Sequence, residues 1–149
     1  MSASPRWPLL VATMLAFGPP VVFGALWSDY APARDYISEL GARGAPNALA
    51  VNLSFAVAGV AVILACRAIG QARPTLSGAM WMVSALGASY VMAAMAPCDA
   101  GCPAGGSGTQ ALHNLSGALG YLAGGAGLLA AGRRLAADER QPVHLRCRE

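Results

Sequence analysis

The stretch ALAVNLSFAVAGVAVILAC at residues 48–66 decides the fold of this chain of 149 residues. It contains no charged side chain, and its length is close to the roughly 20 apolar residues that a helix needs to cross a bilayer. A backbone in lipid must satisfy its own hydrogen bonds, and a helix does this within one segment. The stretch therefore predicts a membrane-spanning helix.

Three similar segments, at about 7–27, 75–96 and 111–132, accompany it. The chain is 56% hydrophobic and 11% charged, whereas soluble domains carry about 25% charged residues. We predict an all-α polytopic membrane protein, with residues 1–149 as one domain of four transmembrane helices in an antiparallel bundle. Gly18-Pro19-Pro20 predicts a kink in the first helix. The alternative for this segment is a cleaved signal peptide, with Arg6 as its positively charged n-region and the apolar run as its h-region.

The arginines predict the orientation of the helices. Arg6, Arg67, Arg73 and the arginines of a loosely ordered tail at 133–149 fall on one side of a four-span arrangement. The positive-inside rule then places both termini in the cytoplasm and the loops at 28–47 and 97–110 outside. These arginines flank apolar segments instead of forming a patch, so no nucleic-acid partner is expected.

The cysteines agree with this orientation. Cys98 and Cys102 share an outward loop, where an oxidising compartment favours a disulfide between them. A metal pair and two free thiols are the alternatives, and the lack of nearby histidines disfavours zinc. Cys66 is expected to be a small packing residue, and Cys147 to be a reduced tail thiol that a lipid could modify.

Two features of the apolar segments predict helix packing. An Asn-Leu-Ser triplet begins at Asn52 and again at Asn114, which suggests a parallel two-helix repeat with both amides facing the bundle. Ser116, Gly120 and Gly124 form a small-residue face at four-residue spacing. This face packs either within the bundle, which is the simpler interpretation, or against a partner helix.

Polar residues of the outward side form a candidate site. Its members are expected to share one outer face: Asp35, Ser38, Glu39, Asn52, Asp99, His113 and Asn114. A short interfacial helix over 35–40 would place Asp35 and Glu39 on one side. Together with Asp99 and His113, these carboxylates are candidates for acid–base or metal chemistry. The alternative is that they fold the loops by pairing with Arg34 and Arg43 and by capping a turn. No catalytic or cofactor motif is found, so neither a cofactor nor a metal is predicted.

The sequence also resembles a known family. The resemblance covers roughly residues 30–125 and rests on DYISELG at 35–41, on PCDAGCP at 97–103 before His113-Asn114, and on four residues of the first loop and second helix: Pro46, Asn52, Phe55 and Gly59. These resemble the bacterial membrane proteins catalogued as domain of unknown function 998. The resemblance implies an integral protein of the prokaryotic plasma membrane, here as a shortened four-helix member. The family brings no established activity.

Three functions remain open on the sequence. We favour a small non-enzymatic protein, an accessory or assembly subunit that contacts membrane lipids and packs against other membrane subunits or against itself. The second hypothesis is an enzyme acting on a lipid or lipid-linked substrate at the outer face. The third is a homo-oligomeric channel or transporter.

Overall fold

The computed structural model of the protein describes residues 6–140, and all of its regular elements are helices within this range. Four are α-helices, and two short 3-10 helices, η1 and η2, precede α2 and α3. Their bounds are α1 Arg6–Leu26, η1 Ile37–Gly41, α2 Ala48–Ala72, η2 Pro74–Leu76, α3 Ser77–Met95 and α4 Gly108–Arg140. Each α-helix contains a segment long and apolar enough to cross a membrane, which indicates a multi-pass membrane protein.

The first helix continues through both of its prolines. Pro19 and Pro20 lie inside α1, which the structure assigns as one helix. Each proline removes one backbone donor. Most of its large apolar side chains are exposed at its surface, where a bilayer would cover them.

The second helix is longer than predicted. It ends at Ala72 instead of residue 66, so Arg67 lies within it. An arginine near a helix end can extend its guanidinium towards water while its stem stays on apolar surface. The helix stops where Arg73 precedes Pro74, because the residue before a proline disfavours the α conformation.

The fourth helix is also longer than predicted. It starts at Gly108 and continues to Arg140, so the expectation of a loosely ordered tail is wrong for residues 133–140. Leu135, Ala136 and Ala137 are strong helix formers. Arg134 also donates a hydrogen bond from Nη1 to the Thr75 carbonyl oxygen. The rest of the predicted tail, with Cys147, lies outside the described residues.

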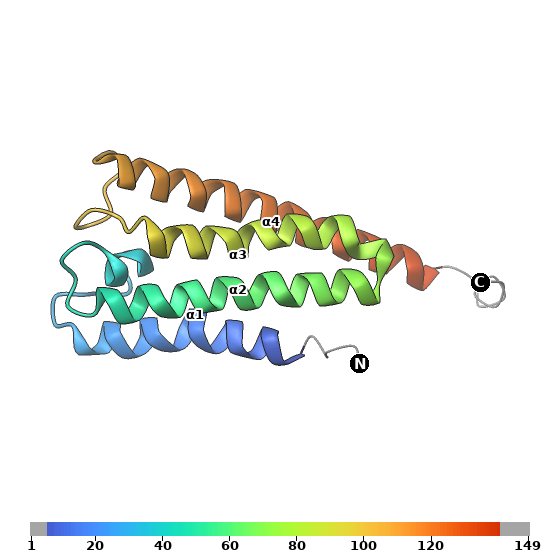
Figure 1. Ribbon diagram of the computed structural model, residues 1–149, viewed down its shortest axis with the longest axis horizontal. Helices are drawn as coiled ribbons and strands as arrows, with labels where there is room; N and C mark the ends of the chain where they lie inside the picture. Colours follow the sequence, from blue (N-terminus) through green and yellow to red (C-terminus); the bar gives the residue numbers. More distant parts are fainter. Residues whose placement is uncertain (1–5, 141–149) are drawn as a thin grey trace.

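The helices pack in chain order. Among the described residues, extensive contacts join α1 to α2, α2 to α3 and α3 to α4. Figure 1 shows that the connections α1–α2 and α3–α4 lie at one end of the molecule, and that the α2–α3 turn lies at the other. We call these the loop end (residues 27–47 and 96–107) and the turn end (around Arg73).

Glycines allow the closest approach between helices. Gly59 of α2 and Gly87 of α3 face each other, and a Cβ on either would overlap the carbonyl oxygen of the other. Only glycine can bring two helix backbones this close, as at other small-residue contacts in membranes. Two apolar clusters complete the core, one around Met80 at the turn end and one around Val51 at the loop end.

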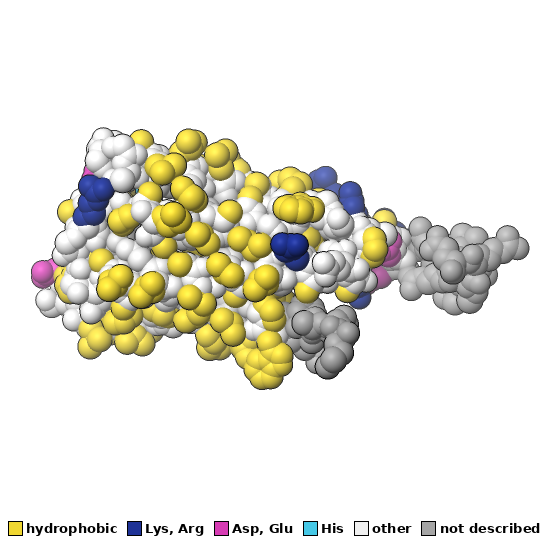
Figure 2. Space-filling view, in the orientation of Figure 1, with side chains coloured by type: hydrophobic (Ala, Val, Ile, Leu, Met, Phe, Trp, Pro, Cys, Tyr) yellow, Lys and Arg dark blue, Asp and Glu magenta, His cyan; other side chains and the backbone are white. Residues whose placement is uncertain are grey.

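Apolar and charged side chains are distributed along the length of the bundle, from the loop end to the turn end. Figure 2 shows hydrophobic side chains over the middle of the visible face and charged side chains towards its two ends. Arg34 and Arg43 belong to the loop end, whereas Arg67 and Arg73 lie beside the turn. An apolar band between polar ends is the distribution that a bilayer requires.

Candidate functional site

A cavity of about 470 Å³ lies at the loop end, between α1 and α4. α2 and α3 contribute to its lining, as does the segment around η1. It is lined by residues from every α-helix and from both connections of the loop end: Ala16, Phe17, Asp35, Tyr36, Ile37, Ser38, Gly41, Asn52, Phe55, Ser89, Tyr90, Ala93, Pro97, His113, Gly117 and Tyr121. Small-molecule sites have volumes of about 300–1,000 Å³ and sit between helices in bundles.

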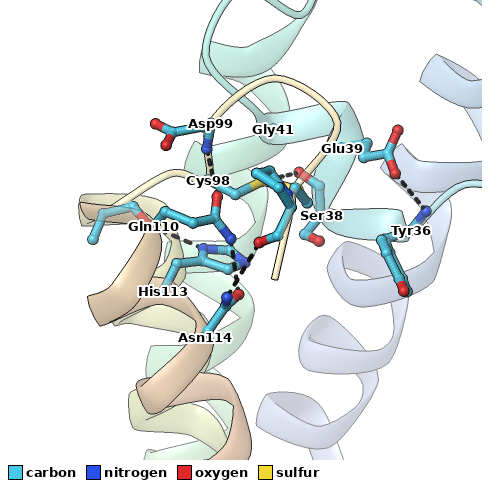
Figure 3. The surroundings of a disulfide bond; sticks show 12 residues. Tyr36, Ser38, Glu39, Gly41, Cys98, Asp99, Gln110, His113 and Asn114 are labelled. Atoms are coloured by element: carbon cyan, nitrogen blue, oxygen red, sulfur yellow. Dashed lines mark hydrogen bonds between the residues drawn. A yellow bond between two sulfur atoms is a disulfide. The ribbon is translucent and has the colours of Figure 1, made fainter. Parts of the chain in front are cut away.

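The structure brings together only part of the predicted outer face. Asp35, Ser38, Asn52 and His113 line the cavity. The remaining three predicted residues, Glu39, Asp99 and Asn114, are not in its lining. Figure 3 shows the Glu39 and Asp99 carboxylates pointing away from His113, so the four candidate catalytic residues do not converge.

The expected pairing of Asp35 with Glu39 on one helix face is wrong. The helix in this loop is the 3-10 helix η1, which begins at Ile37, so Asp35 precedes it. Asp35 instead accepts hydrogen bonds from Arg34 Nε at 2.6 Å and from the Ala31 amide at 2.7 Å. Both partners favour the ionised carboxylate, with Arg34 as the larger cause, and they lower the pKa of Asp35.

Glu39 and Asp99 shape the loops, in agreement with the alternative considered above. Glu39 accepts a hydrogen bond from the Tyr36 amide at 3.1 Å. Asp99 accepts from the Ser107 amide and the Ser107 hydroxyl, each at 2.8 Å, and these bonds lower the pKa of Asp99. Arg43 forms an ion pair with Asp99 at 3.8 Å instead of with Glu39.

His113 lies one and a half turns inside α4 and is held at one nitrogen. Its Nδ1 is 3.0 Å from the Ala96 carbonyl oxygen, which closes the end of α3. A carbonyl oxygen only accepts, so Nδ1 carries the proton of this bond. In the neutral ring the other nitrogen, Nε2, is then a hydrogen-bond acceptor for the cavity.

The two Asn-Leu-Ser triplets make matching contacts. Asn52 donates from Nδ2 to the Gly41 carbonyl at 2.9 Å, and Asn114 donates from Nδ2 to the Pro103 carbonyl at 3.3 Å; each acceptor lies eleven residues earlier. Ser54 and Ser116 each bond to the carbonyl oxygen three residues before them. The expectation that both amides face the bundle is wrong for Asn114, which is exposed and donates to the loop carbonyls of Pro103 and Ala104.

The disulfide closes a small ring within the α3–α4 connection, and this ring packs against the α1–α2 connection. Cys98 and Cys102 are bonded, with their Cα atoms 5.1 Å apart. Both are buried in a cluster with Ala42, and the Arg43 amide donates to the Cys98 carbonyl at 2.9 Å. Cys98 Sγ also lies 3.5 Å from the Ser38 carbonyl oxygen. Through these contacts the disulfide ring is linked to the η1 segment, which contributes Ser38 to the cavity lining.

Sequence reasoning missed Gln110, the most deeply buried polar residue described, with no exposed surface. Its Oε1 accepts from the Asp99 amide at 2.7 Å, and its Nε2 donates to Asn114 Oδ1 at 2.9 Å. A signal was present, because Ser107-Gly108-Thr109-Gln110 fits the capping box. The Gln110 amide does donate to Ser107 Oγ at 3.3 Å.

The predicted small-residue face of α4 lies against α3. A Cβ on Gly120 would overlap Ser89, and one on Gly124 would contact Leu86. Ser116 bonds within its own helix. In contrast, a Cβ added to Gly117, Gly125 or Gly132 would meet no atom within 4 Å, so there is open space beside these positions on α4.

Comparisons with known proteins place the chain in a family. Neither a search of curated proteins nor a search of solved structures gave a match. A family model with the description "Protein of unknown function (DUF998)" matches residues 10–148. This match runs from the first turns of α1 to beyond α4 and therefore includes both connections of the loop end. The chain belongs to the family described as Protein of unknown function (DUF998).

Proposed function

We propose that the protein is a small non-enzymatic subunit of the prokaryotic plasma membrane, an accessory or assembly factor that packs against a larger membrane complex or a second copy. Its four helices cross the bilayer antiparallel, with both termini in the cytoplasm and the loop end outside. The arginine distribution supports this orientation, because cytoplasmic flanks are enriched in arginine. The disulfide supports it as well, because thiols pair in oxidising compartments.

The observation that carries the proposal is the division of the α4 glycines between two faces. Gly120, Gly124 and Gly127 meet α3, whereas Gly125 and Gly132 meet nothing. Gly125 and Gly132 are seven residues apart, or about two turns, so they lie on one side of the helix. Such exposed glycines leave a shallow surface on which the backbone of a partner helix can approach closely.

Association of the full chain in mild detergent tests this proposal. We expect the protein to migrate as a complex, and Gly125→Leu and Gly132→Leu to reduce the complexed fraction at least fivefold, because a leucine side chain holds a partner helix away. Gly78→Leu is the matched control, since Gly78 also meets nothing but lies in the first turn of α3. A monodisperse wild-type monomer without a co-purifying protein would contradict the proposal.

The enzyme hypothesis requires residues that the cavity does not assemble. Of the four candidates, only Asp35 and His113 line it, and Asp35 already accepts from Arg34 and Ala31. Within residues 6–140, no group of three or more His, Cys, Asp or Glu is placed to hold a metal ion. The arrangement of the cavity favours binding over acid–base chemistry at these residues.

A further inference from the structure

We propose that the cavity at the loop end binds one uncharged amphiphile, with a compact head that donates hydrogen bonds through hydroxyl groups and a single apolar chain. This is a ligand site in addition to the partner surface on α4. Three properties of the cavity lead to this ligand class: its shape, its hydrogen-bonding groups and its charge.

The shape of the cavity suits a chain that enters from the membrane. Its deep part is lined by Phe17 of α1, Phe55 of α2 and Gly117 of α4. It lies between α1 and α4, which share no extensive contact in the described chain. From His113 to Tyr121 the lining descends about 12 Å at 1.5 Å per residue. The hydrocarbon core is about 30 Å thick, so this depth lies within one leaflet.

The polar end of the cavity offers acceptors as well as donors. Asn52 donates one of the two N–H groups of its Nδ2 to the Gly41 carbonyl, so its Oδ1 and its second N–H remain for a ligand. His113 uses Nδ1 for the Ala96 carbonyl, which leaves Nε2 as an acceptor in the neutral ring. The Ser38 hydroxyl can donate or accept. A hydroxyl group both donates and accepts, so it can pair with all three side chains. A head that only accepts hydrogen bonds leaves the acceptors, His113 Nε2 above all, without a partner.

The charge of the cavity disfavours an ionic head. Asp35 is the one charged side chain among the described lining residues, and Arg34 pairs with it through Nε at 2.6 Å. This carboxylate is thus compensated from outside the cavity, and no arginine lines the interior to receive a phosphate or carboxylate. An uncharged head avoids the desolvation cost that an unpaired charge would carry.

Three probes with the same oleoyl chain separate these properties. Monoolein has donor hydroxyls and no charge, methyl oleate only accepts, and oleate is an anion. We expect native mass spectrometry of the full-length protein to detect one bound monoolein, with saturation. Methyl oleate and oleate are each expected to bind about tenfold more weakly, the factor that one or two lost hydrogen bonds imply. Equal binding of the three probes, or tighter binding of oleate, would overturn the proposed ligand class.

Two glycine variants on α4 separate this site from the partner surface. Gly117→Leu fills the cavity and should weaken monoolein binding at least tenfold, and it should fold because a Cβ there meets nothing. Gly125→Leu adds the same side chain two turns deeper, outside the cavity, and should leave monoolein binding unchanged. Ala16→Leu, on the α1 side, provides a second obstruction.

The two proposals fail in different ways. If Gly117→Leu and Ala16→Leu both bind monoolein like the wild type, the cavity is not the site, whatever the complex does. If Gly125→Leu leaves the complex intact while Gly117→Leu still loses monoolein, the amphiphile site stands and the partner surface fails.

Discussion

At the residue scale, the buried side chain of Gln110 ties the α3–α4 connection to α4 through two hydrogen bonds. Replacing it by alanine leaves the Asp99 amide and the Asn114 carboxamide oxygen without their partners. We expect Gln110→Ala to lower the free energy of unfolding by about 1–3 kcal/mol, the cost of leaving buried polar groups unsatisfied. Denaturant titration in mixed micelles measures this change.

A second glutamine provides the control for that measurement. Gln71 is exposed near the end of α2, so Gln71→Ala should change the free energy of unfolding by less than about 0.5 kcal/mol. Equal effects of the two substitutions would contradict the role assigned to Gln110.

Asp99 should make the stability of the folded protein depend on pH in the acidic range. Its folded pKa is lowered from the ordinary value of 3.8, chiefly by its bonds to Ser107. The unfolded chain therefore binds the proton more tightly, and the contribution of Asp99 is complete above about pH 4 and is lost as the pH falls through the lowered folded pKa. Thermal midpoints between pH 6 and pH 3 should fall less steeply in Asp99→Asn than in wild type. Identical slopes would show that Asp99 does not contribute.

The sequence predicted which polar residues lie at the loop end better than which way their side chains point. Asp35, Ser38, Asn52 and His113 do line one space. The prediction that Asp35 and Glu39 share a helix face is wrong because the helix begins only at Ile37, and because a 3-10 helix has three residues per turn. Gln110 escaped notice because a glutamine in a helix is usually a surface residue, and its burial depends on where Asp99 of another element lies.

At the element scale, the crossing of α2 and α3 depends on one pair of glycines. We expect Gly59→Leu to lower the free energy of unfolding by about 1–3 kcal/mol, because its side chain would overlap the Gly87 carbonyl and push the helices apart. Denaturant titration in mixed micelles measures this change. Gly78→Leu is the control, because it places a leucine in open space on α3. An equal decrease in the free energy of unfolding for both variants would argue against the role of the Gly59–Gly87 contact.

Helix existence was predictable, but helix ends were not. The four apolar runs were sufficient to find α1 to α4, because lipid forces an apolar segment into a helix. The ends of α2 and α4 lie beyond the apolar runs, at Ala72 and Arg140. There the helix continues in polar residues, and hydropathy no longer reports its length.

At the scale of the whole molecule, three cysteines can test the orientation. Without reductant, an impermeant maleimide added to intact cells should label neither Cys98 nor Cys102, because they are bonded to each other. After reduction, the reagent should label Cys102, the less buried of the two, from outside, and Cys147 only once the membrane is permeabilised. Labelling of Cys147 in intact cells would contradict cytoplasmic termini.

The order of helix contacts could not be read from the sequence. A predicted four-helix bundle leaves open which helices touch, and small-residue faces occur on several of them. The structure joins consecutive helices and leaves α1 and α4 apart at the cavity. Phe17 of α1 and Tyr121 of α4 line that cavity, and no periodic pattern distinguishes them from lipid-facing residues.

The length of α4 has a mechanical consequence. A helix of 33 residues is about 50 Å long, some 20 Å more than the hydrocarbon layer. Its last turns therefore extend as a continuous helix into the aqueous phase beside the turn, and Arg134 bonds this extension to the Thr75 carbonyl. A tilt of this extension, such as one imposed by a bound protein, would be transmitted along α4 to the cavity, which the other end of the helix lines.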